Sequence, residues 1–303
     1  MRVLILGSAA GGGLPQWNCG CRNCREARSR GGGRTQSCVA VTADGERWIL
    51  LNASPDLRVQ VAAHPALWPR SGGPRDSPIR AVALTDGEID HTLGLMLLRE
   101  AGERVPVYAP GGVAALLDGP WPLARVLSAY AGVELRVLQK QRETPLAYLA
   151  GASLGISCSA IAVAGHRPRY ARAAPAGATL VGLRLLDKRT GGILAYIPTS
   201  AAVDDAVRTL AAGADLLLFD GTFWSDGELR QAGVDAPGAR AIGHLPVGGQ
   251  DGSLAALPAL GARRTVLVHI NNTNPILCAT AAERETVEAA GIVVGDDGME
   301  FEL

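Results

Sequence analysis

Four residues that can bind a metal ion or move a proton stand close together in the first third of this sequence. Asp86, Glu88, Asp90 and His91 offer carboxylate oxygens and an imidazole within six residues. An apolar run precedes them and leucines with helical spacing follow, so a loop between a strand and a helix can turn several of them toward one point. An acidic first turn that caps the helix explains the same pattern without a metal. For this segment alone the two explanations are equally good.

A second group of potential ligands is the cysteine cluster, Cys19, Cys21 and Cys24, spaced C-x-C-x-x-C. Closely spaced thiolates hold soft or borderline metal ions, and a structural zinc site needs four such donors. The cluster therefore predicts a structural zinc ion (Zn²⁺), with a fourth donor from the last loop of the chain. Without a metal, three reactive thiols would lie side by side. The other three of the six cysteines stand in apolar runs or near a helix start, as packing residues do.

The composition excludes several classes of function. The chain has 303 residues, 48% of them hydrophobic, and its 29 lysines and arginines balance 29 aspartates and glutamates. This balance gives no indication of binding to nucleic acid or to an anionic membrane. No segment approaches the roughly 18 apolar residues of a membrane span, and the N-terminal apolar run is too short for a signal peptide. We therefore expect a cytoplasmic protein that acts on a small molecule, with residues 1–303 in one domain.

Apolar strands alternate with helices, in the manner of an α/β (α+β) protein. Strands or hairpins are expected at residues 2–6, 37–54, 79–84, 105–108, 135–138, 153–164, 179–197, 215–219 and 265–268. Helices are expected at residues 55–67, 114–130 and 204–212, after His91 and near Ser253. The glycines of Gly7–Gly13 resemble a dinucleotide-binding loop, but Pro15 and the cysteine cluster follow where that motif needs an apolar helix. They are expected to form a tight loop instead.

Several polar residues stand just past predicted strands, and these are Asp90 with His91, His166, Asp220 and His269. Layered α/β proteins gather their active-site groups at such strand ends. A single histidine or aspartate after a strand is ordinary loop chemistry. Four such positions in this order indicate a shared site.

The order of these residues resembles the metallo-β-lactamase superfamily, whose H-x-H-x-D-H motif is followed by a histidine, a bridging aspartate and a final histidine. The resemblance implies an αββα sandwich. Asp86 and Glu88 stand where the superfamily has its first two histidines, so one of the two usual metal sites is compromised. The superfamily residue types are kept at Asp90, His91, His166, Asp220 and His269.

The second metal site keeps its ligands in this alignment. Asp90, His91 and His269 supply two imidazoles and a carboxylate, with Asp220 as a fourth ligand or hydrogen-bonding partner. This is the ligand set of non-haem iron(II) oxygenases, which leave coordination positions open for dioxygen and substrate. The resemblance therefore favours Fe²⁺ in the active site.

Within the superfamily the chain resembles the B proteins of pyrroloquinoline quinone (PQQ) biosynthesis, through its cysteine cluster and the segments Thr85–His91, Gly243–Pro246 and His269–Pro275. The resemblance implies an iron-dependent hydroxylase that uses dioxygen on a tyrosine-derived PQQ precursor, either a small molecule or a peptide-derived one. Two alternatives stay open. One is a carrier of PQQ or its precursor toward the periplasm, and the other is a metal-dependent hydrolase.

The resemblance also suggests roles for the remaining polar residues. Asp86 and Glu88 become acid–base or substrate-orienting groups, and His166 becomes a weak metal ligand or supports one. His244 donates either to the substrate or only to the backbone. Related phosphodiesterases have a histidine three residues after the final active-site histidine, where this chain has Asn272, a poor zinc ligand. The fourth ligand of the cysteine site therefore stays open, and a homodimer is compatible with the chain.

Overall fold

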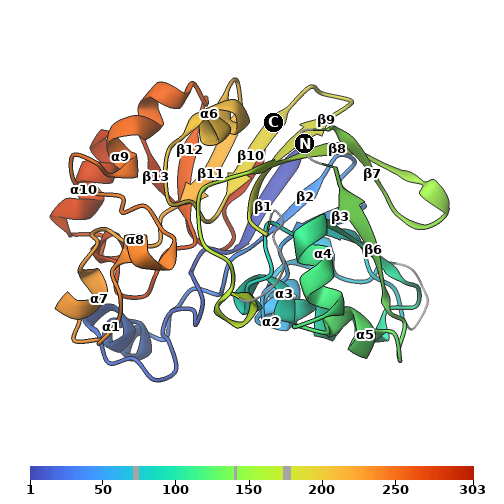
Figure 1. Ribbon diagram of the computed structural model, residues 1–303, viewed down its shortest axis with the longest axis horizontal. Coiled ribbons are helices and arrows are strands. Elements are labelled where there is room, and N and C mark those ends of the chain that lie inside the picture. The colour runs from blue at the N-terminus through green and yellow to red at the C-terminus, as the bar shows by residue number, and fades with distance from the viewer. Residues whose placement is uncertain (71–74, 140–141, 173–178) are drawn as a thin grey trace.

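Two sheets packed face to face form the centre of the protein, and helices cover their outer faces (Figure 1). This computed structural model describes residues 1–70, 75–139, 142–172 and 179–303. Within these ranges each sheet has seven strands. The arrangement is the αββα sandwich expected from the sequence.

The first sheet has the strand order β14-β1-β2-β3-β4-β5-β6. Its strands are β1 (Arg2–Gly7), β2 (Cys38–Thr42), β3 (Trp48–Leu51), β4 (Ile79–Ala83), β5 (Val105–Pro110), β6 (Val133–Leu138) and β14 (Glu300–Glu302). Pairing is antiparallel from β14 to β3 and parallel from β3 to β6. The carboxyl ends of the parallel strands therefore lie side by side, and the segment that carries Asp86 follows the end of β4.

The second sheet has the order β13-β12-β11-β10-β9-β8-β7. Its strands are β7 (Thr144–Ala147), β8 (Ser153–Ala162), β9 (Val181–Asp187), β10 (Ile193–Ile197), β11 (Leu216–Asp220), β12 (Thr265–Val268) and β13 (Val293–Val294). Pairing is antiparallel from β7 to β10 and parallel from β10 to β13. Asp220 is the last residue of β11, and His269 directly follows β12.

Alternation of side chains along the strands divides the core into layers. In β1, Val3 and Ile5 belong to the cluster between the two sheets, whereas Leu4 and Leu6 belong to the cluster under the helices of the first sheet. Successive strand residues point to opposite faces, so a strand buried on both faces is apolar throughout. This is why β1 reads as a continuous apolar run.

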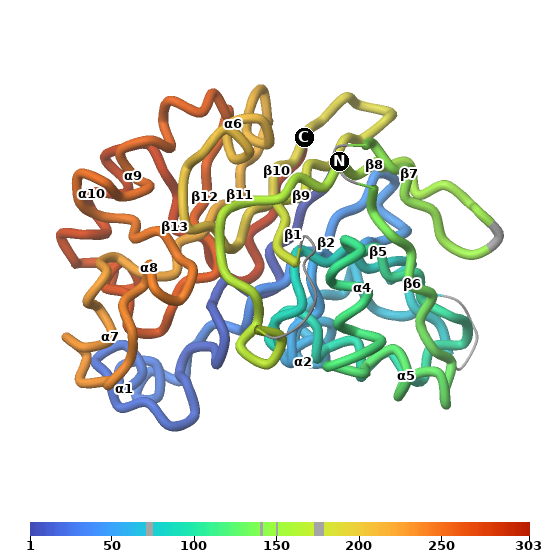
Figure 2. Tube along the Cα trace, in the orientation of Figure 1, coloured from blue at the N-terminus to red at the C-terminus, as the bar shows by residue number. Residues whose placement is uncertain are grey.

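The helices lie in two groups on the outer faces of the sandwich. They are α1 (Arg22–Arg30), α2 (Leu57–Ala63), α3 (Ile89–Thr92), α4 (Gly111–Asp118), α5 (Leu123–Leu127), α6 (Asp205–Ala211), α7 (Glu228–Gln231), α8 (Ala239–Ile242), α9 (Ser253–Ala256) and α10 (Ala282–Ala289). In Figure 2, α2, α4 and α5 cover the first sheet, α6, α9 and α10 cover the second, and α1 lies beside α7. Among the described residues, no helix is both long and apolar enough to span a bilayer.

Two helical regions differ from the sequence-based expectation. α1 was not expected, because Cys24 is its one buried residue and the sequence carries no apolar period there. Where a helix was expected after His91, the chain forms only the short α3, which contains His91, and then a 3-10 helix, Leu93–Glu100. The backbone N–H of Gly94 donates to the carbonyl of Ala53 (2.9 Å), so this turn is bonded to the segment after β3 rather than within an α-helix. An added Cβ at Gly94 would lie 2.2 Å from the Ser54 carbonyl oxygen, so the close approach requires glycine.

Candidate metal centre

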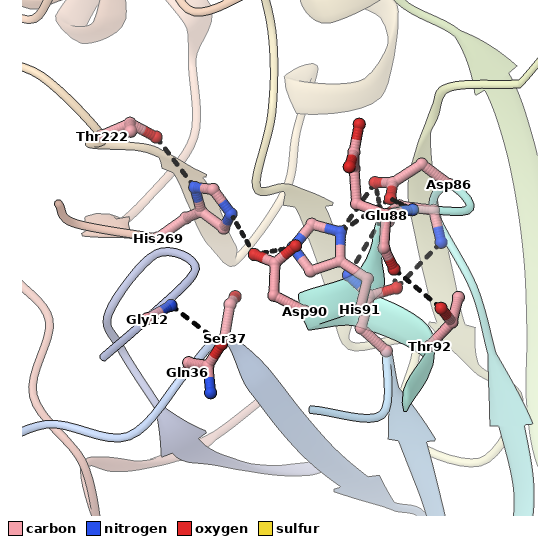
Figure 3. Close-up of polar contacts among 12 residues, drawn as sticks. Gly12, Gln36, Ser37, Asp86, Glu88, Asp90, His91, Thr92, Thr222 and His269 are labelled. Carbon is pink, nitrogen blue, oxygen red and sulfur yellow. Dashed lines mark hydrogen bonds and ion pairs between the residues drawn. The ribbon is translucent and has the colours of Figure 1, made fainter. Parts of the chain in front are cut away.

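The short helix α3, which follows β4, and the residue after β12 bring Asp90, His91 and His269 together (Figure 3). One ligand atom from each lies within 4.8 Å of the others. Oδ2 of Asp90 is 3.3 Å from Nε2 of His269 and 3.7 Å from Nε2 of His91. The Nε2 of His91 is buried and has no hydrogen-bond partner in the described part of the chain. Because an unpaired buried nitrogen is costly, a metal ion at this point fits the three residues.

Asp86 lies behind His91 and holds its ring. Nδ1 of His91 is 2.8 and 2.9 Å from the two Asp86 carboxylate oxygens. Asp86 also accepts hydrogen bonds from the Thr85 hydroxyl (2.7 Å) and the Glu88 backbone N–H (2.9 Å), and it is 2% exposed. A carboxylate on Nδ1 is the usual support of a metal-binding histidine, because it turns the Nε2 lone pair toward the metal. Asp86 therefore faces His91 and not an open surface.

Thr222 supports His269 in a similar way. Nδ1 of His269 lies 2.8 Å from the Thr222 hydroxyl, which lies 2.6 Å from Oδ1 of Asp220. The His269 N–H donates to this hydroxyl, which in turn donates to the carboxylate, so Nε2 is left to face Asp90. Asp220 is fully buried and also accepts hydrogen bonds from the backbone N–H groups of Ser200 and Thr222.

The charges in this site favour a cation. Burial alone would lower the pKa of His91, but the charges of Asp86 and Asp90 raise it to about 9. Burial lowers the pKa of His269, which therefore stays neutral. Despite its burial, Asp90 has a lowered pKa because both histidines interact with it. Two carboxylates around His91 thus stabilise one positive charge, carried by a proton or by a metal ion.

His244 joins this network, and His166 does not. Nδ1 of His244 is 2.8 Å from Oδ2 of Asp220, and its ring stacks on His269 with centroids 5.4 Å apart. Asp220, His244 and His269 form a second group with metal-ligand spacing, but the Thr222 hydroxyl lies within 3.1 Å of all three. That group is therefore explained by hydrogen bonds. His166 is exposed, packs against Gly243 and belongs to neither group, in contrast to its expected place as a ligand or its support.

Glu88 and a glycine loop line the same site. The Glu88 side chain is half-buried beside Asp90 and makes no hydrogen bond within the described ranges. Burial, then the charges of Asp86 and Asp90, raise its pKa to about 7. An added Cβ at Gly11 would lie 3.2 Å from Oδ2 of Asp90, and Gly12 has a φ of +94°. The glycines thus form the expected tight loop and leave space at the carboxylate.

The three clustered cysteines lie at the start of α1 with their sulfur atoms within 4.8 Å of one another. The side-chain amide of Asn272 points into the cluster, and its Nδ2 is 3.1, 3.5 and 3.3 Å from the sulfurs of Cys19, Cys21 and Cys24. Asn272 belongs to the loop after β12, the region expected to supply the fourth ligand. Rotation of the amide by 180° turns its oxygen toward the sulfurs, so the four side chains fit a zinc ion with three thiolates and one oxygen.

Known proteins resemble this chain along its whole length. A model of the beta-lactamase superfamily domain matches residues 47–270. Coenzyme PQQ synthesis protein B of Cupriavidus necator is 42% identical over 306 residues, covering 99% of each sequence. The protein of the same name from Pseudomonas paraeruginosa is 45% identical over 309 residues, covering 100% of each. The chain belongs to the PqqB family.

Solved structures agree with this assignment. The crystal structure of Zn²⁺-bound PqqB from Methylobacterium extorquens has a TM-score of 0.89 and 41% identity to this member of the PqqB family, with 100% of both chains covered. A diphosphatase of the PhnP family, 23% identical with a TM-score of 0.69, shares the fold. The family and the metallo-β-lactamase fold expected from the sequence are confirmed.

Three supporting residues of this PqqB family member were not singled out from the sequence. Thr222 joins Asp220 to His269, and the Thr85 hydroxyl bonds Asp86. Asn23 donates to two carbonyls of the loop that carries Asn272. Threonine next to a strand-end aspartate and asparagine in a first helical turn are common for local backbone reasons. Their sequence signal is therefore weak.

Proposed function

We propose that this protein acts in PQQ biosynthesis as an iron(II)-dependent oxygenase that hydroxylates a tyrosine-derived precursor. The observation that carries the proposal is the group formed by Asp90, His91 and His269, in which both imidazoles direct Nε2 to one carboxylate. When bound there, iron(II) supplies redox chemistry with dioxygen at open coordination positions, which zinc lacks. The names of the PqqB relatives support the pathway.

The surrounding residues have defined tasks in this proposal. Asp86 fixes the orientation of His91, and Thr222 fixes that of His269. The Glu88 carboxylate, which has no hydrogen-bond partner in the described part of the chain, accepts a substrate proton or orients the substrate. Burial alone would lower the pKa of His244, but the charge of Asp220, 2.8 Å from Nδ1, raises it. The charged ring, 13% exposed, can therefore donate from Nε2 to a bound substrate.

The donor atoms argue against a dinuclear hydrolase. Such an enzyme holds a hydroxide between two metal ions and needs ligands for both. Both oxygens of Asp86 contact His91, and the oxygens of Asp220 accept hydrogen bonds from Ser200, Thr222 and His244. A carrier, in turn, has no need of the buried unpaired Nε2 of His91. The oxygenase accounts for both features.

A zinc ion on Cys19, Cys21, Cys24 and Asn272 completes the proposal as a structural site. The amide position and the sulfur spacing support it. We propose that the reaction takes place in the cytoplasm, where neighbouring thiols stay reduced. Dioxygen and the PQQ precursor are the proposed partners of the active site, and a homodimer is the proposed assembly.

The test compares iron-loaded and zinc-loaded protein with and without oxygen. We expect precursor-dependent oxygen uptake by the iron form alone, and its loss in His269→Ala and Asp90→Ala variants that keep their circular dichroism spectrum. Full turnover by the zinc form without oxygen would refute the oxygenase and favour the hydrolase. Precursor binding that neither substitution nor oxygen removal changes, with no oxygen uptake, would favour the carrier.

A further inference from the structure

We infer that Asn23 couples the cysteine cluster to the active-site histidine, His269. The coupling runs through the loop Asn271–Asn274, which carries the fourth donor of the cluster. Only Ile270 separates this loop from His269. This inference rests on the two metal sites proposed above. It assigns Asn23, which lies beside the cysteine cluster, a role in positioning His269 of the active site.

Asn23 holds the loop through both protons of its amide. Its Nδ2 donates to the backbone carbonyls of Asn272 and Asn274, each at 2.9 Å. Asn23 lies in the first turn of α1, directly before Cys24, the buried member of the cluster. Asn23 therefore adds a second link between the cluster and the loop, beside the contacts of Asn272 with the sulfurs, and its amide has no spare donor.

The loop is joined in turn to the residue that supports His269. The backbone N–H of Asn271 donates to the carbonyl of Thr222 (3.0 Å). The amide of Asn274, fully buried, donates to the carbonyls of Gly221 (2.9 Å) and Thr222 (3.3 Å). The Thr222 hydroxyl is the partner of His269 Nδ1 at 2.8 Å. Movement of the loop therefore acts on the backbone of Thr222 and on the histidine that its hydroxyl orients.

His269 needs such support because of its backbone conformation. Its φ is +57°, in the left-handed region that residues with a Cβ seldom occupy. A conformation of this kind persists where surrounding contacts fix it. On one side, the Ile270 N–H donates to the Ser8 carbonyl and the Ala10 N–H to the Ile270 carbonyl, both at 2.9 Å. Asn23 and the cysteine cluster supply the contacts on the other side.

The experiment uses Asn23→Ala, Asn23→Ser and Asn23→Asp in the full chain. Ser29→Ala is the control, because it removes one hydrogen bond from the exposed face of the same helix (2.9 Å to the Glu26 carbonyl). Zinc content is measured first, then hydrogen exchange of residues 270–274, and then the affinity of the active site for Co²⁺. The His269→Ala variant identifies the Co²⁺ bound at the active site.

We expect Asn23→Ala to keep its zinc, because the three thiolates remain, but to exchange the loop amides about tenfold faster. Its active-site affinity for Co²⁺ should fall about tenfold, as it does when the support of a ligand is lost. Asn23→Asp should show faster loop exchange and lower Co²⁺ affinity than Asn23→Ala, because its carboxylate faces two carbonyls. Asn23→Ser, with its single donor, should lie between Asn23→Ala and the unmodified protein in both measurements. Ser29→Ala should match the unmodified protein.

Unchanged loop exchange and unchanged Co²⁺ affinity in Asn23→Ala would overturn the inference, as would equal effects from Ser29→Ala. If Asn23→Ala lost its zinc, the comparison between Asn23→Ser and Ser29→Ala would decide, since serine keeps one donor. Neither measurement needs turnover. A protein that consumes no oxygen but shows the expected exchange and affinity would contradict the oxygenase and leave the coupling in place.

Discussion

Nδ1 of His91 lies 2.8 and 2.9 Å from the two carboxylate oxygens of Asp86. In the superfamily motif a histidine stands at this aspartate's position and binds a metal directly. Here the side chain contacts the ring of a neighbouring candidate ligand. One substitution thus removes a donor from the position of the superfamily's first metal site and adds support to a candidate ligand of the second.

The first prediction concerns this pair. Asp86→Ala should lower the affinity of the active site for Fe²⁺ or Co²⁺ by about 10–100-fold, because His91 loses the group that orients it. Competition with a chelator of known affinity measures the change. Asp118→Asn, an exposed carboxylate at the end of α4, is the control. An affinity of Asp86→Ala equal to that of the control would mean that the pair does not position the histidine.

A second prediction is that the active site holds one metal ion. Asp220 and His244 are joined through the Thr222 hydroxyl, which occupies the centre of the only other group of potential ligands at this edge in the described residues. Anomalous scattering from crystals soaked in Co²⁺ should therefore give one peak among Asp90, His91 and His269. A second fully occupied peak beside Asp220 would contradict the mononuclear assignment.

A third prediction concerns the cysteine cluster. Cys21→Ser should lose most of the bound zinc, because the hydroxyl is a much weaker donor than a thiolate. The melting temperature should fall by about 1.5–2 °C for each kcal/mol of stability that the metal supplied. Cys278→Ser, at a half-exposed cysteine outside the cluster, should change neither zinc content nor melting temperature. Equal zinc in both variants would refute the site.

The fourth prediction is a pH dependence of stability that originates at Glu228. Burial raises the pKa of this carboxyl to about 7 from 4.5, although it accepts hydrogen bonds from Thr273 and Trp224. The folded state therefore binds its proton more tightly than the unfolded state. The stabilisation is present below pH 4.5 and is lost as the pH rises through 7.

Replacement by glutamine removes this proton linkage and keeps the shape of the side chain. Relative to the unmodified protein, Glu228→Gln should gain about 1–3 kcal/mol of unfolding free energy between pH 4.5 and pH 8. Urea unfolding at both pH values measures the difference. For Glu285→Gln, at an exposed position on α10, the unfolding free energy should change with pH as it does in the unmodified protein. If Glu228→Gln showed the same pH dependence as the unmodified protein, burial of the Glu228 carboxyl would have no effect on stability.

Most of the strands could be predicted because each is buried on one or both faces. β11 and β12 are fully buried and largely apolar, and their ends brought Asp220 and His269 into the predicted site. α1 could not be predicted in this way, since its contacts are made by sulfur atoms and by Asn23 and not by an apolar stripe. Where an element packs through apolar side chains, the hydrophobic periodicity of the sequence predicts it.

The place of His166 outside the site and the contact of His244 with Asp220 could not be predicted, for a different reason. His166 and His244 are both followed by a proline within two residues, and the spacing along the chain does not say which ring turns inward. Gly243 has a φ of +102° and ends α8 directly before His244, whose N–H bonds back to Ala239. This turn, rather than a strand end, brings His244 to Asp220. The direction of a side chain on such a loop depends on tertiary contacts, and the local sequence pattern does not reveal these.

The pairing of β1 with β14 has a consequence for synthesis of the chain. Arg2 lies opposite Glu302, so this side of the first sheet stays open until residues 300–302 have left the ribosome. At about 5–20 residues per second, the interval between β2 and β14 lasts roughly 10–50 s. During that time the backbone groups on one edge of β1 can pair with another nascent chain. Ribosome stalling between residue 269 and β14 should therefore lead to aggregation of the nascent chain before it affects metal loading.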